Sequence, residues 1–75
     1  MSGRMPMLKA EDVIRVLKVL GFFEARTKGS HIFFKHPDGR TTLVLKHGGE
    51  DIGRGLLRQI LKEIKITSEE FSKLL

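Results

Sequence analysis

The stretch His36–Arg40, which reads His-Pro-Asp-Gly-Arg, limits what this chain can fold into more than any other. Proline presets the backbone angle at the second position of a turn, and glycine can adopt the left-handed conformation that a tight turn requires. The flanking segments, His31–His36 and Thr41–Lys46, are rich in β-branched, aromatic and aliphatic residues. We therefore predict two antiparallel strands joined by a hairpin, with a third strand at Phe22–Arg26 and a turn at Thr27–Gly29.

Other stretches have the apolar spacing of amphipathic helices. In Ala10–Leu20 the apolar residues form one stripe at helical period, and Gly21 follows as a left-handed stop. A second stripe runs through Arg54–Ile64, and the capping-box pair Thr67 and Glu70 indicates a short third helix. The predicted fold class is α+β: an α-β-β-β-α two-layer domain with a three-stranded antiparallel sheet, helices on one face and a short C-terminal helix.

Length and composition exclude several classes of protein. The 75 residues suffice for one domain (1–75), in which residues 1–6 are expected to form a frayed tail. There is no cysteine for a disulfide framework, and no apolar run approaches the roughly 20 residues that span a bilayer. We expect a soluble, cytoplasmic protein with no membrane partner. A net charge of +5 favours a polyanionic partner, nucleic acid first, although a charge of this size is also ordinary for a soluble domain.

The residue with the clearest chemical capacity is His31. Gly29 and Ser30 precede it, so that two backbone amides are expected beside a ring at the start of a strand. An imidazole can accept and return a proton near neutral pH, and Lys28 and Lys35 supply positive charge for phosphate. These groups suit general acid–base cleavage of RNA, whereas the plain structural alternative is a partly buried strand histidine that only packs.

A metal site is not predicted. Side chains alternate across a strand, so His31 and His36 should point to opposite faces and cannot readily share an ion. His47 could approach His31, but two imidazoles without a placed carboxylate or thiolate are weak evidence for metal binding. The glycine-rich loop that contains Gly48 and Gly49 lacks the lysine-serine pattern of a phosphate-binding loop, so nucleotide hydrolysis is not expected either.

The predicted sheet has two apolar faces, and two short helices can cover only one of them. Phe33 points to one face and Phe34 to the other. Either Ile32, Phe34 and Val44 or Phe33, Leu43 and Leu45 are left open. An open apolar patch of this kind usually binds a partner, and base stacking on Phe33 is one possible use of it.

Several short motifs occur together in this chain. They are Leu20-Gly21-Phe22, Lys28-Gly29-Ser30-His31, His36-Pro37-Asp38-Gly39, His47, Gly55 and Leu57-Arg58-Gln59-Ile60-Leu61-Lys62. In this order and at this chain length, the sequence resembles the HicA-type toxins, also called the YcfA-like family, of bacterial and archaeal toxin–antitoxin systems. It departs from the family pattern at Leu45, where proline is common, and at Leu56, where threonine is common.

The resemblance implies a fold like a double-stranded RNA-binding domain and a ribonuclease that cuts mRNA while a HicB-type antitoxin holds it inactive. It places the family's catalytic histidine on His31. The expected mechanism uses no metal and no cofactor, and it leaves a 2′,3′-cyclic phosphate and a 5′-hydroxyl end. The residues expected to bind RNA are Lys28, Gly29 and Ser30, with Lys35 and His47 as weaker candidates. His31 serves as both base and acid, or His47 shares the task.

Two other functions fit the same residues. The first is a non-catalytic RNA-binding module of the same fold that uses Lys28, Lys35 and Arg40 on backbone phosphates. The second is a protein-interaction domain whose apolar face docks a partner, with the positive charge incidental.

Overall fold

The computed structural model describes residues 8–46 and 51–75. The predicted frayed tail at 1–6, His47 and the glycine pair at 48–49 lie outside these residues. No helix within the described part of the chain is long and apolar enough to cross a membrane. The elements, in chain order, are β1 (Leu8–Lys9), α1 (Ala10–Val19), β2 (Phe23–Lys28), β3 (His31–Lys35), β4 (Thr41–Leu45), β5 (Asp51–Ile52), α2 (Arg54–Ile64) and α3 (Ser68–Ser72).

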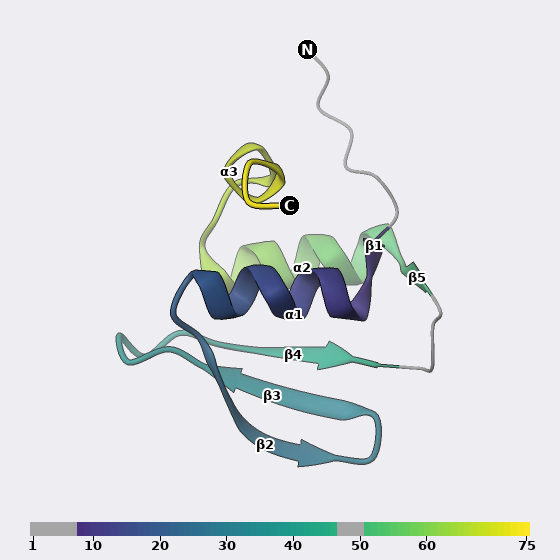
Figure 1. Cartoon of the computed structure of the whole chain (residues 1–75), viewed down its shortest axis with the longest axis vertical. Coiled ribbons are helices and arrows are strands. Elements are labelled where there is room, and N and C mark those ends of the chain that lie inside the picture. Colours follow the sequence, from purple (N-terminus) through teal and green to yellow (C-terminus); the bar gives the residue numbers. More distant parts are fainter. Residues whose placement is uncertain (1–7, 47–50) are drawn as a thin grey trace.

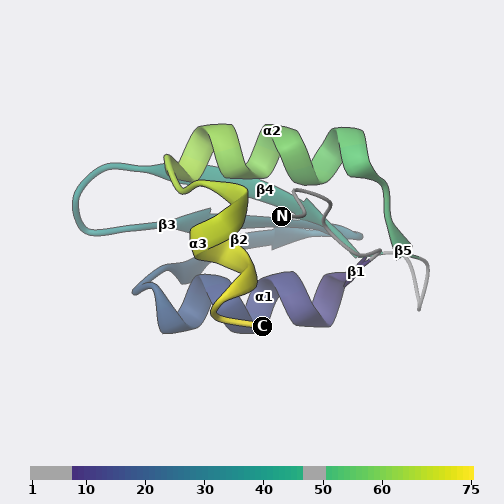
Figure 2. The ribbon, with the colours of Figure 1, turned by 90° about the horizontal axis from the view of Figure 1, so that it is seen from above.

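The structure has two main layers, as predicted. β2, β3 and β4 form an antiparallel sheet in that order, and α1 and α2 lie side by side on one of its faces (Figures 1 and 2). The short helix α3 lies over the two longer helices, on their side away from the sheet. The predicted α+β fold class, with a three-stranded sheet and a short C-terminal helix, is confirmed.

One small element was not predicted. β1 pairs with β5 in an antiparallel ladder that joins Leu8 to Ile52 and Lys9 to Asp51. Leu8 and Ile52 are both buried, so the pair adds to the core beside the first turns of α1 and α2. The sequence patterns predict no strand at Leu8–Lys9 or Asp51–Ile52, because two-residue strands are too short to show an alternating pattern.

The turn between β2 and β3 also differs from the prediction. Lys28 pairs directly with His31, so the connection is a two-residue turn of Gly29 and Ser30. Gly29 has a φ of 59°, and a positive φ at the first central position is the geometry in which two-residue hairpins favour glycine. Thr27 and Lys28 therefore belong to the strand rather than to a turn, which continues the ladder up to the catalytic candidate.

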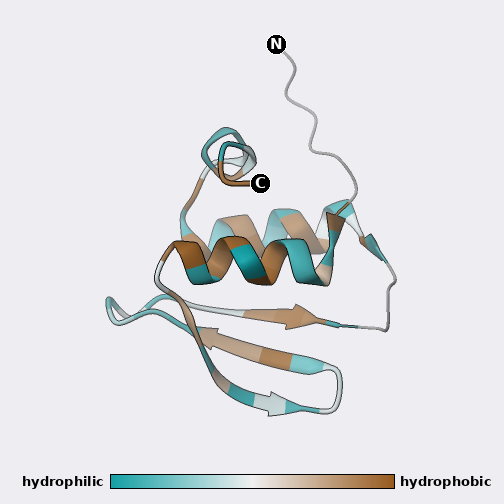
Figure 3. Cartoon of the chain, in the orientation of Figure 1, coloured by the Kyte–Doolittle hydropathy of each residue, from teal (hydrophilic) through white to brown (hydrophobic). Residues whose placement is uncertain are grey.

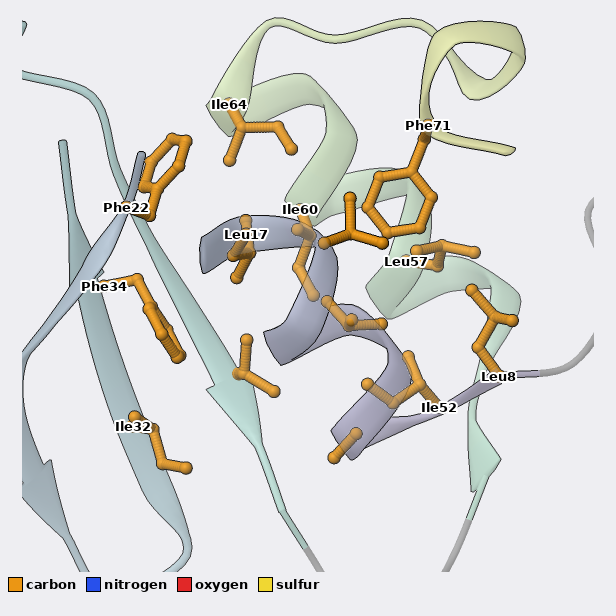
Figure 4. Packing of buried hydrophobic residues seen from close by; sticks show 14 residues of the cluster. Leu8, Leu17, Phe22, Ile32, Phe34, Ile52, Leu57, Ile60, Ile64 and Phe71 are labelled. Atoms are coloured by element: carbon orange, nitrogen blue, oxygen red, sulfur yellow. The ribbon is translucent and has the colours of Figure 1, made fainter. Parts of the chain in front are cut away.

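The core lies between the sheet and the helices. Ile32 and Phe34 point from β3 toward Leu17 and Ile60 of the two long helices (Figure 4), and Phe34 is only 1% exposed. Val44 of β4 is fully buried on the same side. By contrast, every residue of β2 is exposed, because the helices contact β4 and leave this edge strand uncovered.

Candidate functional site

The face of the sheet turned away from α1 and α2 carries the predicted catalytic residue. We call it the open face. Residues directly opposite one another in an antiparallel ladder project to the same side, so the ladder register defines its members. They are Phe23, Arg26 and Lys28 of β2, His31, Phe33 and Lys35 of β3, and Thr41, Leu43 and Leu45 of β4.

His31 is exposed at the first position of β3, between Lys28 on one neighbouring strand and Leu45 on the other. The backbone around it is fixed, because the Lys46 N–H donates to the Ser30 carbonyl at 2.8 Å. Within the described part of the chain, no side-chain hydrogen bond or ion pair restrains the His31 ring. The ring is therefore free to meet a ligand from solvent.

Three cations extend along the open face, at different distances from His31. Lys28 lies directly across the ladder, next to the turn. Lys35 is on the same face but four residues further along β3, about 13 Å away at the usual rise per residue. Arg26 lies between them, opposite Phe33, because the register shifts between Glu24 and Arg26. Arg26 is not among the RNA-binding residues that the sequence predicts.

The centre of the open face is apolar. Phe33 is 39% exposed, and Leu43 and Leu45 are half-buried beside it. β3 and β4 are largely hydrophobic along their lengths, whereas β2 is more hydrophilic (Figure 3). A shallow hollow in this part of the sheet is lined by Arg26, Phe33, Lys35 and Leu43 of the open face, and also by residues of the helical side such as Thr42 and Glu63. The sequence did not decide which face of the sheet the helices cover. In the structure the face with Phe33 is uncovered, and it combines an apolar centre with a basic rim.

His36 follows the last residue of β3, and its ring points away from the open face. It is not available as a free base. Its Nε2 donates to the Leu20 carbonyl at 3.1 Å, and its Nδ1 accepts from the Asp38 N–H at 3.1 Å. Asp38 Oδ1 also lies 3.0 Å from Nδ1, a contact that becomes an ion pair only when the ring is protonated. The edge of the ring packs against Phe22, with centroids 4.9 Å apart. His36 thus attaches the β3–β4 hairpin to the end of α1.

Gly21 is required by this attachment. Its φ is 102°, and a Cβ there would lie 3.0 Å from Nε2 of His36. Gly21 and His36 are 15 positions apart in sequence, yet the two motifs that contain them form one contact in the fold. Among residues 8–46 and 51–75, no three histidine, cysteine, aspartate or glutamate side chains are close enough together to hold a metal ion.

Arg40 is also committed to structure. Its guanidinium pairs with Asp38 at 2.8 Å, donates to the Ile64 carbonyl and stacks over the Phe22 ring at 5.1 Å. The Arg40 backbone N–H donates to Asp38 and holds the pKa of that carboxyl below its usual value, with further help from the Arg40 side chain. The alternative RNA-binding module used Arg40 on backbone phosphates. In the structure the Arg40 side chain is held within the domain and is not part of the open face.

The family model for the HicA toxin of bacterial toxin–antitoxin systems matches residues 10–66. No individual curated protein matches the sequence. The matched residues include α1, the whole three-stranded sheet and α2, and so every element that forms the open face or supports it. Because the match covers most of the chain, the protein belongs to the HicA toxin family of bacterial toxin–antitoxin systems.

Proposed function

We propose that this toxin is a metal-independent endoribonuclease that cleaves mRNA in the cytoplasm, with His31 as the general acid–base. The observation that supports this most is the position of His31, exposed on the open face opposite Lys28 and without a described side-chain partner. A histidine that only packed would be buried or hydrogen-bonded, as His36 is.

Cleavage of the RNA backbone through the ribose 2′-hydroxyl needs a base that removes one proton and an acid that supplies another. His31 takes the proton of a ribose 2′-hydroxyl, and the 2′-oxygen forms a bond to the adjacent phosphorus. The bond from phosphorus to the 5′-oxygen then breaks, and that oxygen receives a proton from His31 or His47. The products are a 2′,3′-cyclic phosphate and a 5′-hydroxyl end. Acid–base help of this kind typically accelerates a reaction by 10²- to 10⁴-fold.

The neighbouring residues would position the RNA. Lys28, Gly29 and Ser30, at the turn before His31, are proposed to hold the phosphate that is attacked. Lys35 lies too far along β3 to share that phosphate, so we assign it to a neighbouring one. Phe33, between these positions, is exposed enough to stack against a base.

The family implies an antitoxin partner, and we propose that it resembles HicB antitoxins and covers the open face. An apolar centre with a basic rim fits a partner that presents apolar residues inside an acidic border. A protein bound there would cover His31 and exclude RNA from it. Inhibition by occupation of the site needs no change in the fold of the toxin.

Co-expression of the toxin with the neighbouring reading frame tests this function. We expect the two proteins to co-purify, and cleavage of RNA by the toxin to stop at one antitoxin per toxin. The toxin alone should arrest growth. If the neighbour neither binds nor inhibits, and the toxin is harmless when expressed by itself, the proposed function is wrong.

RNA binding at the open face should depend on salt. Each lysine–phosphate contact on a single strand contributes about 0.7 to the slope of log affinity against log salt. Lys28→Ala should therefore lower that slope by about 0.7 for a six-nucleotide RNA, with a similar loss for every sequence. Lys73→Ala, at the C-terminal end of α3, removes the same charge elsewhere and should leave the slope unchanged. Fluorescence anisotropy at several salt concentrations measures both, and an affinity independent of salt would favour the protein-interaction alternative.

A further inference from the structure

Some cations among the described residues form ion pairs and others do not. Lys9, Arg15, Lys18 and Arg40 form ion pairs with Asp51, Asp12, Glu24 and Asp38. Within the described residues, no ion pair involves the cations of the open face or those along α2. The α2 group is Arg54, Arg58, Lys62 and Lys65, which we call the α2 stripe.

The α2 stripe follows one side of the helix. Arg54, Arg58 and Lys62 are spaced by four residues, which separates them by about 6 Å along the helix axis. Lys65 follows at the helix end in the left-handed conformation. All four residues are exposed. The stripe therefore presents a row of positive charges at regular intervals on a packed helix.

The single acidic residue of α2 lies on another side of the helix. Glu63 accepts hydrogen bonds from Thr42 at 2.7 Å and from Gln59 at 3.0 Å, so it faces β4. At about 100° per residue, Arg54, Arg58 and Lys62 lie roughly 180°, 140° and 100° around the helix from Glu63. The stripe consequently faces away from the sheet and from the open face, and Glu63 does not neutralise it.

The stripe differs chemically from the open face. The large hydrophobic side chains exposed in the described structure are Val19, Phe23, Phe33, Leu74 and Leu75. None of them belongs to α2, so the stripe has charge without an apolar anchor. Stable protein interfaces need buried apolar or aromatic anchors, whereas a nucleic-acid backbone is bound by cations alone. Of the two classes of partner, the stripe fits RNA better than an acidic protein.

We propose that the α2 stripe is a second RNA-binding surface, which holds the phosphate backbone of a long RNA on the helical side of the molecule while another part of that RNA meets His31. The proposal rests on the proposed function, because RNA is the polyanion that the open face is proposed to cleave. A short RNA would contact the open face only, and a longer strand would reach both surfaces.

Binding measurements with paired variants test this proposal. In a His31→Ala background, which keeps the RNA intact, the double variant Arg58→Gln/Lys62→Gln removes two charges from the stripe. Arg15→Gln/Lys18→Gln on α1 is the matched control, with one arginine and one lysine that are already ion-paired. A 30-nucleotide unstructured RNA and a six-nucleotide RNA are titrated by fluorescence anisotropy, with thermal unfolding to confirm that each variant folds.

At about 0.1 M salt, two lost contacts should lower affinity for the 30-nucleotide RNA by roughly 25-fold and the salt slope by about 1.4. The control should lose less than about threefold, and the short RNA should bind both variants alike. Equal losses of affinity for the 30-nucleotide RNA in the two variants would overturn the proposal, and so would no loss in the stripe variant. The second result would favour an acidic protein as the partner of the stripe. The two proposals can be told apart. If proteins that retain His31 never cleave RNA, but the stripe variant binds the 30-nucleotide RNA more weakly than the control does, the proposed nuclease function is wrong and the second RNA-binding surface is supported.

Discussion

Replacing His31 with alanine should abolish RNA cleavage and leave the thermal stability of the protein close to that of the wild type. The described open face carries no other histidine and no carboxylate that could replace His31, so at least the 10²-fold contribution of acid–base help should disappear. The ring is exposed and makes no described side-chain hydrogen bond, so its removal creates neither a cavity nor an unpaired buried group. A cleavage gel and a thermal melt measure the two effects.

His36→Ala is the matched histidine control, because the two residues are five positions apart and point to opposite faces. It should cost about 1–3 kcal/mol of folding free energy, since the Leu20 carbonyl would lose its hydrogen-bond donor. The folded fraction of this variant should still cleave RNA. Undiminished cleavage by His31→Ala, or loss of cleavage by folded His36→Ala, would contradict the assignment.

Adjacent phenylalanines should respond in opposite ways to truncation. Phe34 is 1% exposed in the core, and Phe34→Ala should cost about 3–5 kcal/mol, which is much of the stability expected for so small a domain. Phe33 is 39% exposed on the open face, and Phe33→Ala should cost less than about 1 kcal/mol of stability. Urea denaturation of both variants measures the difference directly.

The Phe33 variant has a second expected effect. If the open face stacks bases and docks the antitoxin, Phe33→Ala should weaken the binding of both partners although the protein remains folded. Equal destabilisation by the two substitutions would mean that the sheet has no uncovered face. Unchanged binding of both partners by Phe33→Ala would remove the apolar centre from the proposed site.

Much of this fold could be predicted from local sequence patterns. The stripe in Ala10–Leu20 and the turn residues in His36–Arg40 each act within one element, and the structure agrees with them to within a residue or two. The predicted capping box is also present, since Glu70 accepts from the Thr67 N–H at 3.1 Å and Thr67 accepts from the Glu70 N–H. The hydrogen bond from the Thr67 N–H stabilises the charged carboxylate of Glu70 and so lowers its pKa.

Long-range packing was harder to predict. Both faces of the sheet are apolar in sequence, and only the docking of the helices decides that Phe34 is covered and Phe33 is not. The pairing of β1 with β5 joins residues more than 40 positions apart, without a local signal. Arg40 looked like a surface cation, but it caps the Ile64 carbonyl across the domain.

The arrangement of the candidate site was predicted in part, and the roles of its residues stay predictions. His31 and Lys28 were expected together, and the two-residue turn places them opposite each other in the ladder. Arg26 lies between Lys28 and Lys35 because of a register shift that no residue pattern in β2 announced. The family was identified from the order of short motifs, and the match over residues 10–66 confirms it. The role of His47 stays a prediction, because that residue lies outside the described part of the chain.

The central claim is that His31 on the open face drives cleavage through the ribose 2′-hydroxyl, and the products of one oligonucleotide test it most directly. The substrate is a labelled RNA that the wild-type toxin cuts, compared with the same sequence carrying a 2′-deoxy sugar on the 5′ side of the cut. We expect the RNA to yield a 2′,3′-cyclic phosphate and a 5′-hydroxyl end, with and without EDTA, and no cleavage of the 2′-deoxy substrate or by His31→Ala. Cleavage of the 2′-deoxy substrate, or products with 3′-hydroxyl and 5′-phosphate ends, would contradict the mechanism.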